Sequence, residues 1–270
     1  MTASFAITVQ RDIPYVGGGD AYRVRRCRLD LHVPAGAEAP PVLVWFHGGG
    51  MTEGDKAAEE TRAVATALAA RGIAVAAANY RLSPAAPYPH YLRDAATAVA
   101  WVGRHAGQYD VGGGGCFLGG HSAGGYLAWM LGLDGRWLAE AGAAPGDLAG
   151  LIPISGQAIT HAAVRAERGI PIDRIIVDDA APLNHTSAAA PPTLAICAAS
   201  DIAKRREENA LLCAALVAAG SPDVTLLTID GRDHMSVILN MPAPGDPVTA
   251  AIVAFIARRR LPSAPPQATA

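Results

Sequence analysis

The chain has 270 residues, of which 51% are hydrophobic and 17% are charged, and its formal net charge is −2. This length is sufficient for one catalytic domain built around a multi-stranded sheet. The near-neutral charge gives no electrostatic basis for binding nucleic acid or a membrane surface, which argues against those two classes of protein.

The first half of the chain predicts strands separated by helices. Residues 22–33 alternate apolar residues with arginines and an aspartate, which indicates an edge or half-exposed antiparallel strand. Residues 42–46 are continuously apolar, as in a parallel strand that is buried on both faces. A helix over 56–70, a second apolar strand over 73–78 and a helix over 92–105 follow.

The second half continues this alternation. Its predicted elements are the strand 116–118, the helix 126–131, the strands 148–154 and 193–198, the helix 204–219 and the strand 224–229. Such alternation predicts an α/β fold with a mostly parallel central sheet of about eight strands and helices on both faces. In sheets of this kind, ligands bind beyond the carboxyl ends of the strands.

One stretch, residues 155–192, is poorly periodic. It is too long for a simple connection, and it holds a short helical piece followed by prolines and aspartates. We interpret it as a small cap inserted into a single domain that spans residues 1–260. The proline- and alanine-rich residues 261–270 are expected to form a disordered tail.

The cellular compartment is predicted from the chain start and the cysteines. The first ten residues do not resemble a signal peptide, and no apolar run approaches the roughly 20 residues of a membrane span. The four cysteines form no Cys-x-x-Cys pair and are expected to be buried reduced thiols: Cys27, Cys116, Cys197 and Cys213. We therefore expect a cytoplasmic protein, with a secreted protein whose leader was removed as the alternative.

Ser122 lies between two glycines in a Gly-x-Ser-x-Gly pattern, after an apolar strand and before a helical stretch. Nucleophilic serines are held in this way at a sharp strand-to-helix turn, where flanking glycines avoid a clash between the two backbones. With 29 glycines in the chain, the pattern can also arise by chance. The prediction that Ser122 is a nucleophile therefore depends on a matching base and acid.

A serine hydroxyl needs a general base, and that base needs a carboxylate to fix its tautomer. Of eight histidines, His234 is best placed, because it follows the last predicted strand. Asp201 ends the preceding strand, so neighbouring strands would bring the two side chains together. Asp178 and Asp179 are weaker alternatives because they follow no complete strand, and Asp233 is expected to be a turn residue.

The third motif is the His-Gly-Gly-Gly run at 47–50, directly after an apolar strand. Acyl transfer passes through an oxyanion, and each backbone N–H directed at it contributes about 3 to 4 kcal/mol of transition-state stabilisation. Because glycines permit this close approach, we assign Gly49 and Gly50 as donors, together with Ala123, which follows the serine. The alternative for this run is a flexible glycine turn.

Residues beside these motifs are expected to support them. His47 would anchor the glycine loop by hydrogen bonds, and His121 would support the turn that holds the serine. His121 and Met51, which follows the glycine run, are also our candidate substrate-binding residues.

No cofactor and no metal is predicted. The glycine runs 17–19 and 112–115 lack the lysine and helix start of a phosphate-binding loop, and no histidine, cysteine or carboxylate cluster has metal-ligand spacing. The expected partner is a small-molecule ester substrate, with no nucleic acid and no membrane span, in a monomer or homodimer.

With these motifs, the chain resembles the α/β-hydrolase superfamily and, within it, esterases of the hormone-sensitive-lipase type. The resemblance covers roughly residues 40–260. Residues 79–84 are similar to the family segment N-Y-R-L-A-P, and residues 94–101 are similar to its D-x-x-x-A-x-x-W helix. The resemblance implies a serine carboxylesterase that acts through an acyl-enzyme, with the nucleophile, acid, base and oxyanion donors named above, in the order that this fold uses.

The chain departs from larger family members in two ways. Only 46 residues precede His47, and Met51 stands where many relatives have an aromatic residue. The small size and the segment 233–238 resemble a compact subgroup with kynurenine formamidase and small acetyl or feruloyl esterases. Arylformamide hydrolysis is therefore the alternative activity, and a non-catalytic hydrolase-fold binding protein is a third hypothesis, which the complete triad opposes.

Overall fold

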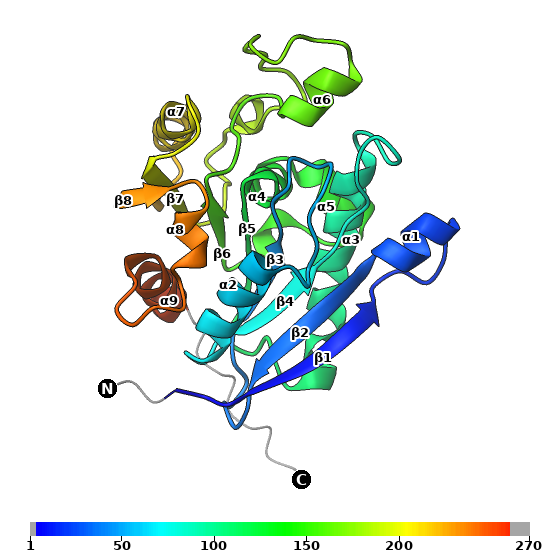
Figure 1. The fold of residues 1–270 in the computed structure, drawn as a ribbon, viewed down its shortest axis with the longest axis vertical. Helices are drawn as coiled ribbons and strands as arrows, with labels where there is room; N and C mark the ends of the chain where they lie inside the picture. The colour runs from blue at the N-terminus through cyan, green and yellow to red at the C-terminus, as the bar shows by residue number, and fades with distance from the viewer. Residues whose placement is uncertain (1–3, 260–270) are drawn as a thin grey trace.

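The computed structural model describes residues 4–259, which form one eight-stranded sheet with helices on both faces (Figure 1). The strands lie in the spatial order β1-β2-β4-β3-β5-β6-β7-β8. Their bounds are β1 Ile7–Pro14, β2 Arg28–Pro34, β3 Val42–Phe46, β4 Ala74–Ala78, β5 Cys116–His121, β6 Gly150–Ile154, β7 Thr193–Ser200 and β8 Val224–Asp233. Strands β3 to β8 pair in parallel, while β2 pairs antiparallel with both β1 and β4. The predicted α/β class and mostly parallel sheet are confirmed.

The sheet is covered on both faces. The helices are α1 Ala21–Arg26, α2 Glu59–Ala69, α3 His90–His105, α4 Ala123–Leu133, α5 Gly135–Glu140, α6 Ala162–Glu167, α7 Arg205–Ala218, α8 Ser236–Leu239 and α9 Pro247–Arg259. Helices α2 and α9 pack on one face, and α3, α4 and α7 pack on the other. The two faces have separate hydrophobic cores because successive side chains of a strand point to opposite sides. In β3, for example, Val44 and Leu43 belong to different cores.

The prediction for the N-terminal region is wrong in one respect. Residues 22–33 do not form one strand, because α1 occupies their first part and β2 begins at Arg28. The carboxylate of Asp20 accepts a hydrogen bond from the Arg23 N–H at 2.8 Å, which caps the helix and competes with the strand pattern. Strand β1 was not predicted either. It pairs with β2 at the edge of the sheet, at the right of Figure 1.

Residues 155–192 leave the carboxyl end of β6 and carry α6, which lies at the top of Figure 1. The expected tail at 261–270 lies outside the described residues. None of the helices within residues 4–259 is long and apolar enough to cross a membrane. Of the four free cysteines, three are buried and Cys116 is partly buried, and burial raises the pKa of each thiol to about 12.

Candidate active site

Ser122 is the residue that joins β5 to α4. Its backbone has a φ of +54° and a ψ of −113°, which is a strained conformation for a residue with a side chain. Two hydrogen bonds hold it there: the Ser122 N–H donates to the Ile154 carbonyl at 2.9 Å, and the Ser122 carbonyl accepts from the Tyr126 N–H at 3.0 Å. The turn directs the serine into a cleft that it helps to line.

The two glycines around the serine are required by space. A Cβ on Gly124 would lie 2.0 Å from the carbonyl oxygen of Phe46, and one on Gly120 would lie 2.4 Å from the carbonyl carbon of Gly124. Real atoms do not approach so closely, so any side chain at either position would push α4 away from the sheet. The steric reason predicted for the Gly-x-Ser-x-Gly pattern is therefore confirmed.

Asp201 and His234 are in direct contact. The Nδ1 atom of His234 lies 2.7 Å from the Oδ1 atom of Asp201. The parallel pairing of β7 with β8 brings Ser200 opposite Asp233. Asp201 directly follows Ser200, and His234 directly follows Asp233. Because the carboxylate accepts, Nδ1 carries the hydrogen and Nε2 is left free to take a proton. His234 lines the same cleft as Ser122.

The carboxylate of Asp201 is fully buried and strongly hydrogen-bonded. Its second oxygen accepts from the hydroxyl of Ser155, and its first also accepts from the Ile202 N–H at 2.8 Å. Burial alone would raise the pKa of Asp201, but the hydrogen bonds from His234 and Ser155 outweigh it and lower the pKa to about 2. The carboxylate is therefore ionised throughout the neutral pH range.

The alternative carboxylates have other partners. Asp178 accepts from the hydroxyl of Thr160 at 2.8 Å and pairs with Arg168 at 2.7 Å. Asp233 accepts from the Met235 N–H at 3.0 Å, as expected of a turn residue.

His121 is buried and packs against His234. Its Nε2–H donates to the carbonyl oxygen of His234 at 2.7 Å, which helps to fix the loop that carries His234. Burial and the nearby His234 lower the pKa of His121 to about 3, so it is a neutral donor. His121 also lines the cleft, whereas Met51 is fully buried and lies outside its lining.

The glycine loop after β3 lies beside Ser122, since a Cβ on Gly48 would be 3.4 Å from the Cβ of the serine. Gly49 has a φ of +101° and Gly50 a φ of +60°, and a Cβ on Gly49 would lie 2.2 Å from the carbonyl oxygen of Glu53. Gly49 and Gly50 line the cleft, and Ala123 is the first residue of α4, where a helix leaves its N–H groups unpaired. No acceptor for these three N–H groups is found within residues 4–259. Ala123 itself is fully buried and lies outside the cleft lining.

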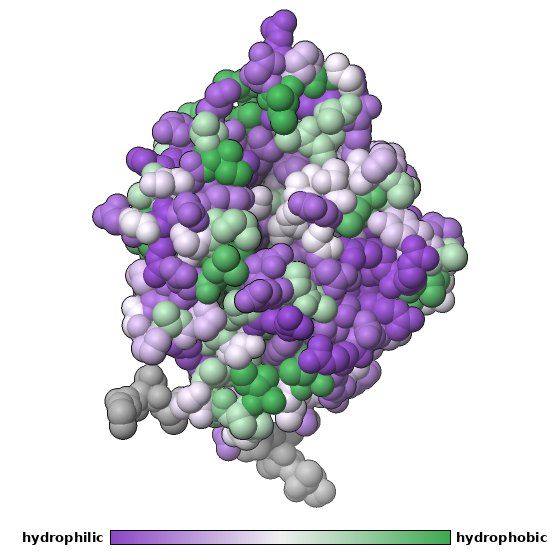
Figure 2. Space-filling model, in the orientation of Figure 1, coloured by the Kyte–Doolittle hydropathy of each residue, from purple (hydrophilic) through white to green (hydrophobic). Residues whose placement is uncertain are grey.

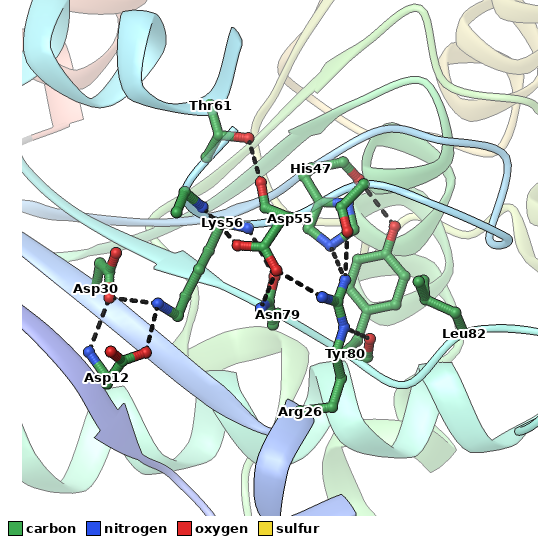
Figure 3. Close-up of polar contacts among 12 residues, drawn as sticks. Asp12, Arg26, Asp30, His47, Asp55, Lys56, Thr61, Asn79, Tyr80 and Leu82 are labelled. Carbon is green, nitrogen blue, oxygen red and sulfur yellow. Dashed lines mark hydrogen bonds and ion pairs between the residues drawn. The ribbon is translucent and has the colours of Figure 1, made fainter. Parts of the chain in front are cut away.

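Hydrogen bonds anchor His47, as expected, and the partner on α1 was not anticipated (Figure 3). Arg26 donates to His47 Nε2 at 3.0 Å and to the Gly54 carbonyl at 2.6 Å, and it pairs with Asp55 at 2.6 Å. Burial lowers the pKa of His47 to about 4, so the ring is neutral and its Nδ1–H donates to the Gly48 carbonyl at 2.6 Å. Arg26 thus contacts the loop after β3 at its start, at His47, and again after the glycine run, at Gly54 and Asp55.

A second group of charges joins the edge strands to the same loop. Lys56 is buried and lies 2.6 Å from Asp30 on β2 and 2.8 Å from Asp12 on β1 (Figure 3). Figure 2 shows hydrophilic residues gathered over β1, β2 and α1, on the face where these pairs lie. Through these contacts, α1 and the edge strands hold the loop after β3 in place, although they contribute no residue to the cleft lining.

The cleft has a volume of about 560 Å³. The segment 155–192 contributes polar residues to its lining and also exposed apolar ones, Ile172 and Ile175. Figure 2 shows hydrophobic residues at the top of the molecule, over the segment that contains α6. The described residues hold no group of three or more histidine, cysteine or carboxylate side chains arranged to bind a metal.

Comparisons with known proteins place this geometry in context. A family model described as BD-FAE matches residues 29–142, which include the glycine loop and Ser122. A solved structure of a truncated carbohydrate esterase from gut microbiota superposes with a TM-score of 0.76 at 16% identity, covering 96% of this chain and 98% of that one. The protein has the α/β-hydrolase fold.

Proteins that are similar to this chain in sequence include esterases. Esterase LipI from Mycobacterium tuberculosis is 40% identical over 98 residues, which are 36% of this chain and 30% of LipI. Esterase LipC from the same organism is 28% identical over 234 residues, which are 80% of this chain and 58% of LipC. The chain spans less than two thirds of the length of these curated relatives.

Proposed function

We propose that this α/β-hydrolase is a serine carboxylesterase that hydrolyses short-chain acyl or aryl esters through an acyl-enzyme. The observation that carries the proposal is the hydrogen bond between His234 and buried Asp201, at a cleft that Ser122 also lines. The esterase names of LipI and LipC support the same activity.

In the first half of the reaction, Nε2 of His234 takes the proton of Ser122 while the serine oxygen attacks the ester carbonyl carbon. The carbonyl oxygen becomes negative and accepts hydrogen bonds from the N–H groups of Gly49, Gly50 and Ala123. The C–O bond then breaks, and the alcohol leaves with the proton that His234 held. An acyl group remains on the serine oxygen.

In the second half, water takes the place of the alcohol. His234 removes a proton from water, the hydroxide attacks the acyl carbon, and the carboxylic acid leaves as the proton returns to the serine. Asp201 remains ionised in both halves because its pKa is about 2, and its charge stabilises the imidazolium that forms twice.

The surroundings of the site belong to the proposal as well. We propose that residues 155–192 act as a small cap, since Gln157, His161 and Arg165 from this segment line the cleft together with the serine. We also propose that the protein acts on small-molecule esters in the cytoplasm, as a monomer or homodimer. The free cysteines, three of them buried, support the reducing compartment.

The activity is tested by comparing two substrates. We expect kcat/KM for p-nitrophenyl acetate to exceed that for N-formylkynurenine by tenfold or more, which corresponds to about 1.4 kcal/mol of transition-state binding. A tenfold preference for the formamide would instead make the protein an arylformamide hydrolase. Hydrolysis of neither substrate, by folded protein, would contradict both activities.

Arg26 is proposed as a positioning residue for the oxyanion loop. We expect Arg26→Met to lower kcat for p-nitrophenyl acetate about 10- to 100-fold with little change in KM, because a displaced Gly49 N–H affects the oxyanion more than the bound ester. Steady-state kinetics measures both constants, and thermal unfolding checks that the variant is folded. Arg25→Met is the matched control, since Arg25 is exposed on the same helix. Equal losses in both variants would count against the role of Arg26.

A further inference from the structure

Two buried arginines line the cleft without a carboxylate partner. Arg205, at the start of α7, is 8% exposed, and Arg165, on α6, is 3% exposed. Neither forms an ion pair with any carboxylate in the described part of the chain, and the Nε–H of each is buried with no hydrogen-bond acceptor. A buried charge without a counter-charge is costly, so this pair calls for an explanation.

The protein satisfies these guanidinium groups only in part. Arg205 donates through one terminal nitrogen to the carbonyl oxygen of Ser155 at 2.7 Å. Arg165 donates through one terminal nitrogen to the carbonyls of Ile172, at 2.7 Å, and Arg174. A guanidinium group has five N–H donors, so most of the donors on Arg205 have no partner among residues 4–259.

Neutral donors lie beside the arginines. The Nδ1 atom of His161 accepts from the Ala163 N–H at 3.1 Å, which leaves the hydrogen on Nε2. Burial and the charges of Arg205 and Arg165 lower the pKa of His161 to about 3, so the ring remains a neutral donor. Gln157 uses its side-chain oxygen to accept from the Ala162 N–H at 2.9 Å, and its amide group is left to donate. Both residues line the cleft.

The carboxylates near the two arginines do not pair with them directly. Glu208 is partly buried in the cleft lining and accepts from the Ala158 N–H at 3.1 Å, and the ionised Asp201 also acts on Arg205 through its charge. Burial raises the pKa of Glu208, and the oxygens of Asp201 already accept from His234 and Ser155. Glu60 also lines the cleft and is partly buried, whereas Glu53 and Asp173, the latter between two residues whose carbonyls bind Arg165, are exposed, and water and salt screen their charges.

This group of donors is connected to the catalytic centre. Arg205 binds the carbonyl of Ser155, the hydroxyl of Ser155 binds Asp201, and Asp201 binds His234. An anion held by Arg205 therefore lies at the same end of the cleft as the acid and base of the triad. The planar fork of a guanidinium group matches a carboxylate, which is a common anionic group on small organic esters.

We propose that Arg205 and Arg165 bind a carboxylate of the substrate, so that the preferred substrates are esters that carry a free carboxylate. The carboxylate belongs either to the acyl part, as in a monoester of a dicarboxylic acid, or to the alcohol part, as in an acylated hydroxybenzoate. This inference rests on the proposed esterase activity for its catalytic consequence, but the binding itself does not require turnover.

The kinetic test compares charged and neutral esters of similar size. We expect kcat/KM for mono-p-nitrophenyl glutarate to exceed that for methyl p-nitrophenyl glutarate about tenfold or more if the acyl part carries the anion. The same preference for 4-acetoxybenzoate over its methyl ester would assign the anion to the alcohol part. Absence of preference in both pairs, with the neutral esters hydrolysed, would overturn the inference and leave the esterase activity standing.

Two variants with the same charge change locate the effect. Arg205→Gln is expected to reduce the charged-to-neutral preference to about onefold, while its glutamine can still donate to Ser155. Arg206→Gln is the matched control, because Arg206 is exposed on the same helix and lies outside the cleft lining. We expect the control to keep the preference. Equal reduction in both would show a general charge effect and would contradict a bound carboxylate.

A binding measurement on the unaltered protein covers the case in which a variant fails to fold or no ester is turned over. Calorimetric titration with glutarate and with 4-hydroxybenzoate is expected to show saturable binding of at least one of them, weakened by high salt, and none of glutaramide. If no ester is hydrolysed but an anion binds, the proposed activity fails and the carboxylate site holds. Binding of neither anion would refute the site.

Discussion

Replacing Ser122 by alanine is expected to lower kcat for p-nitrophenyl acetate by about 10⁵- to 10⁶-fold, because no other group can form the acyl-enzyme. The geometry supports so large an effect: Ser122 occupies a strained turn that glycines on both sides make space for, and it shares its cleft with His234. Alanine removes only the hydroxyl, so the backbone turn and the oxyanion donors are retained. Steady-state kinetics at neutral pH measures the loss of kcat.

The control for this variant is Ser187→Ala, since Ser187 is exposed and lies outside the cleft lining. It is expected to keep the rate of the unaltered protein. Calorimetric binding of substrate analogues to Ser122→Ala is expected to be unchanged. An alanine variant that retains more than about a hundredth of the original kcat would be incompatible with Ser122 as the nucleophile.

Asp201→Asn is expected to lower kcat about 10⁴-fold. In the unaltered protein, the carboxylate of Asp201 accepts from Nδ1 of His234 and from the hydroxyl of Ser155. An asparagine can turn its amide group toward Nδ1, which then has to accept, and the hydrogen moves to Nε2, where the proton of Ser122 should go. The negative charge that stabilises the imidazolium is lost as well. Kinetics with p-nitrophenyl acetate measures the loss of activity, and a melting curve checks that the variant is folded.

Asp233→Asn is the matched control, because this neighbouring carboxylate is exposed and only caps a turn through the N–H groups of Met235 and Ser236. We expect it to retain most of the activity. If Asp201→Asn kept activity while Asp233→Asn lost it, the assignment of the acid would have to be reversed.

The sequence was sufficient to predict the site residues that lie at the ends of strands. The apolar strands and their order placed Asp201 and His234 at neighbouring strand ends, and the pairing of β7 with β8 puts them in contact. The glycine spacing around Ser122 also had a local steric cause that needs no knowledge of distant residues. These inferences succeeded because hydrophobic periodicity and close backbone packing act over short stretches of chain.

Three residues that support the site were not predicted, because long-range contacts place them: Ser155, Arg26 and Arg205. Ser155 had one available signal, since it directly follows β6 at the carboxyl edge of the sheet, but serine at such a position is common. Arg26 contacts His47 from a helix that the alternating pattern had suggested was a strand. In the sequence, nothing distinguishes Arg205 from an exposed helical arginine, and only the fold shows that it is buried. Met51, expected at the substrate, is instead packed in the core.

Together, the contacts assign different tasks to different parts of the chain. The strand ends carry Asp201, His234 and Ser122, helix α1 contacts the glycine loop through Arg26, and the segment after β6 adds Arg165 to the cleft. Substrate choice would then be set by residues outside the catalytic motifs. This arrangement is common in folds that host many related activities on one scaffold.

The most direct test of a catalytic serine is covalent labelling with a fluorophosphonate, followed by intact-mass and peptide mass spectrometry of the folded protein. We predict stoichiometric modification of Ser122 alone, slowed strongly in His234→Ala and absent in Ser122→Ala, because phosphonylation requires the activated hydroxyl and the oxyanion donors. Folded, unaltered protein that remains unlabelled, or that is labelled at another serine, would contradict the central claim.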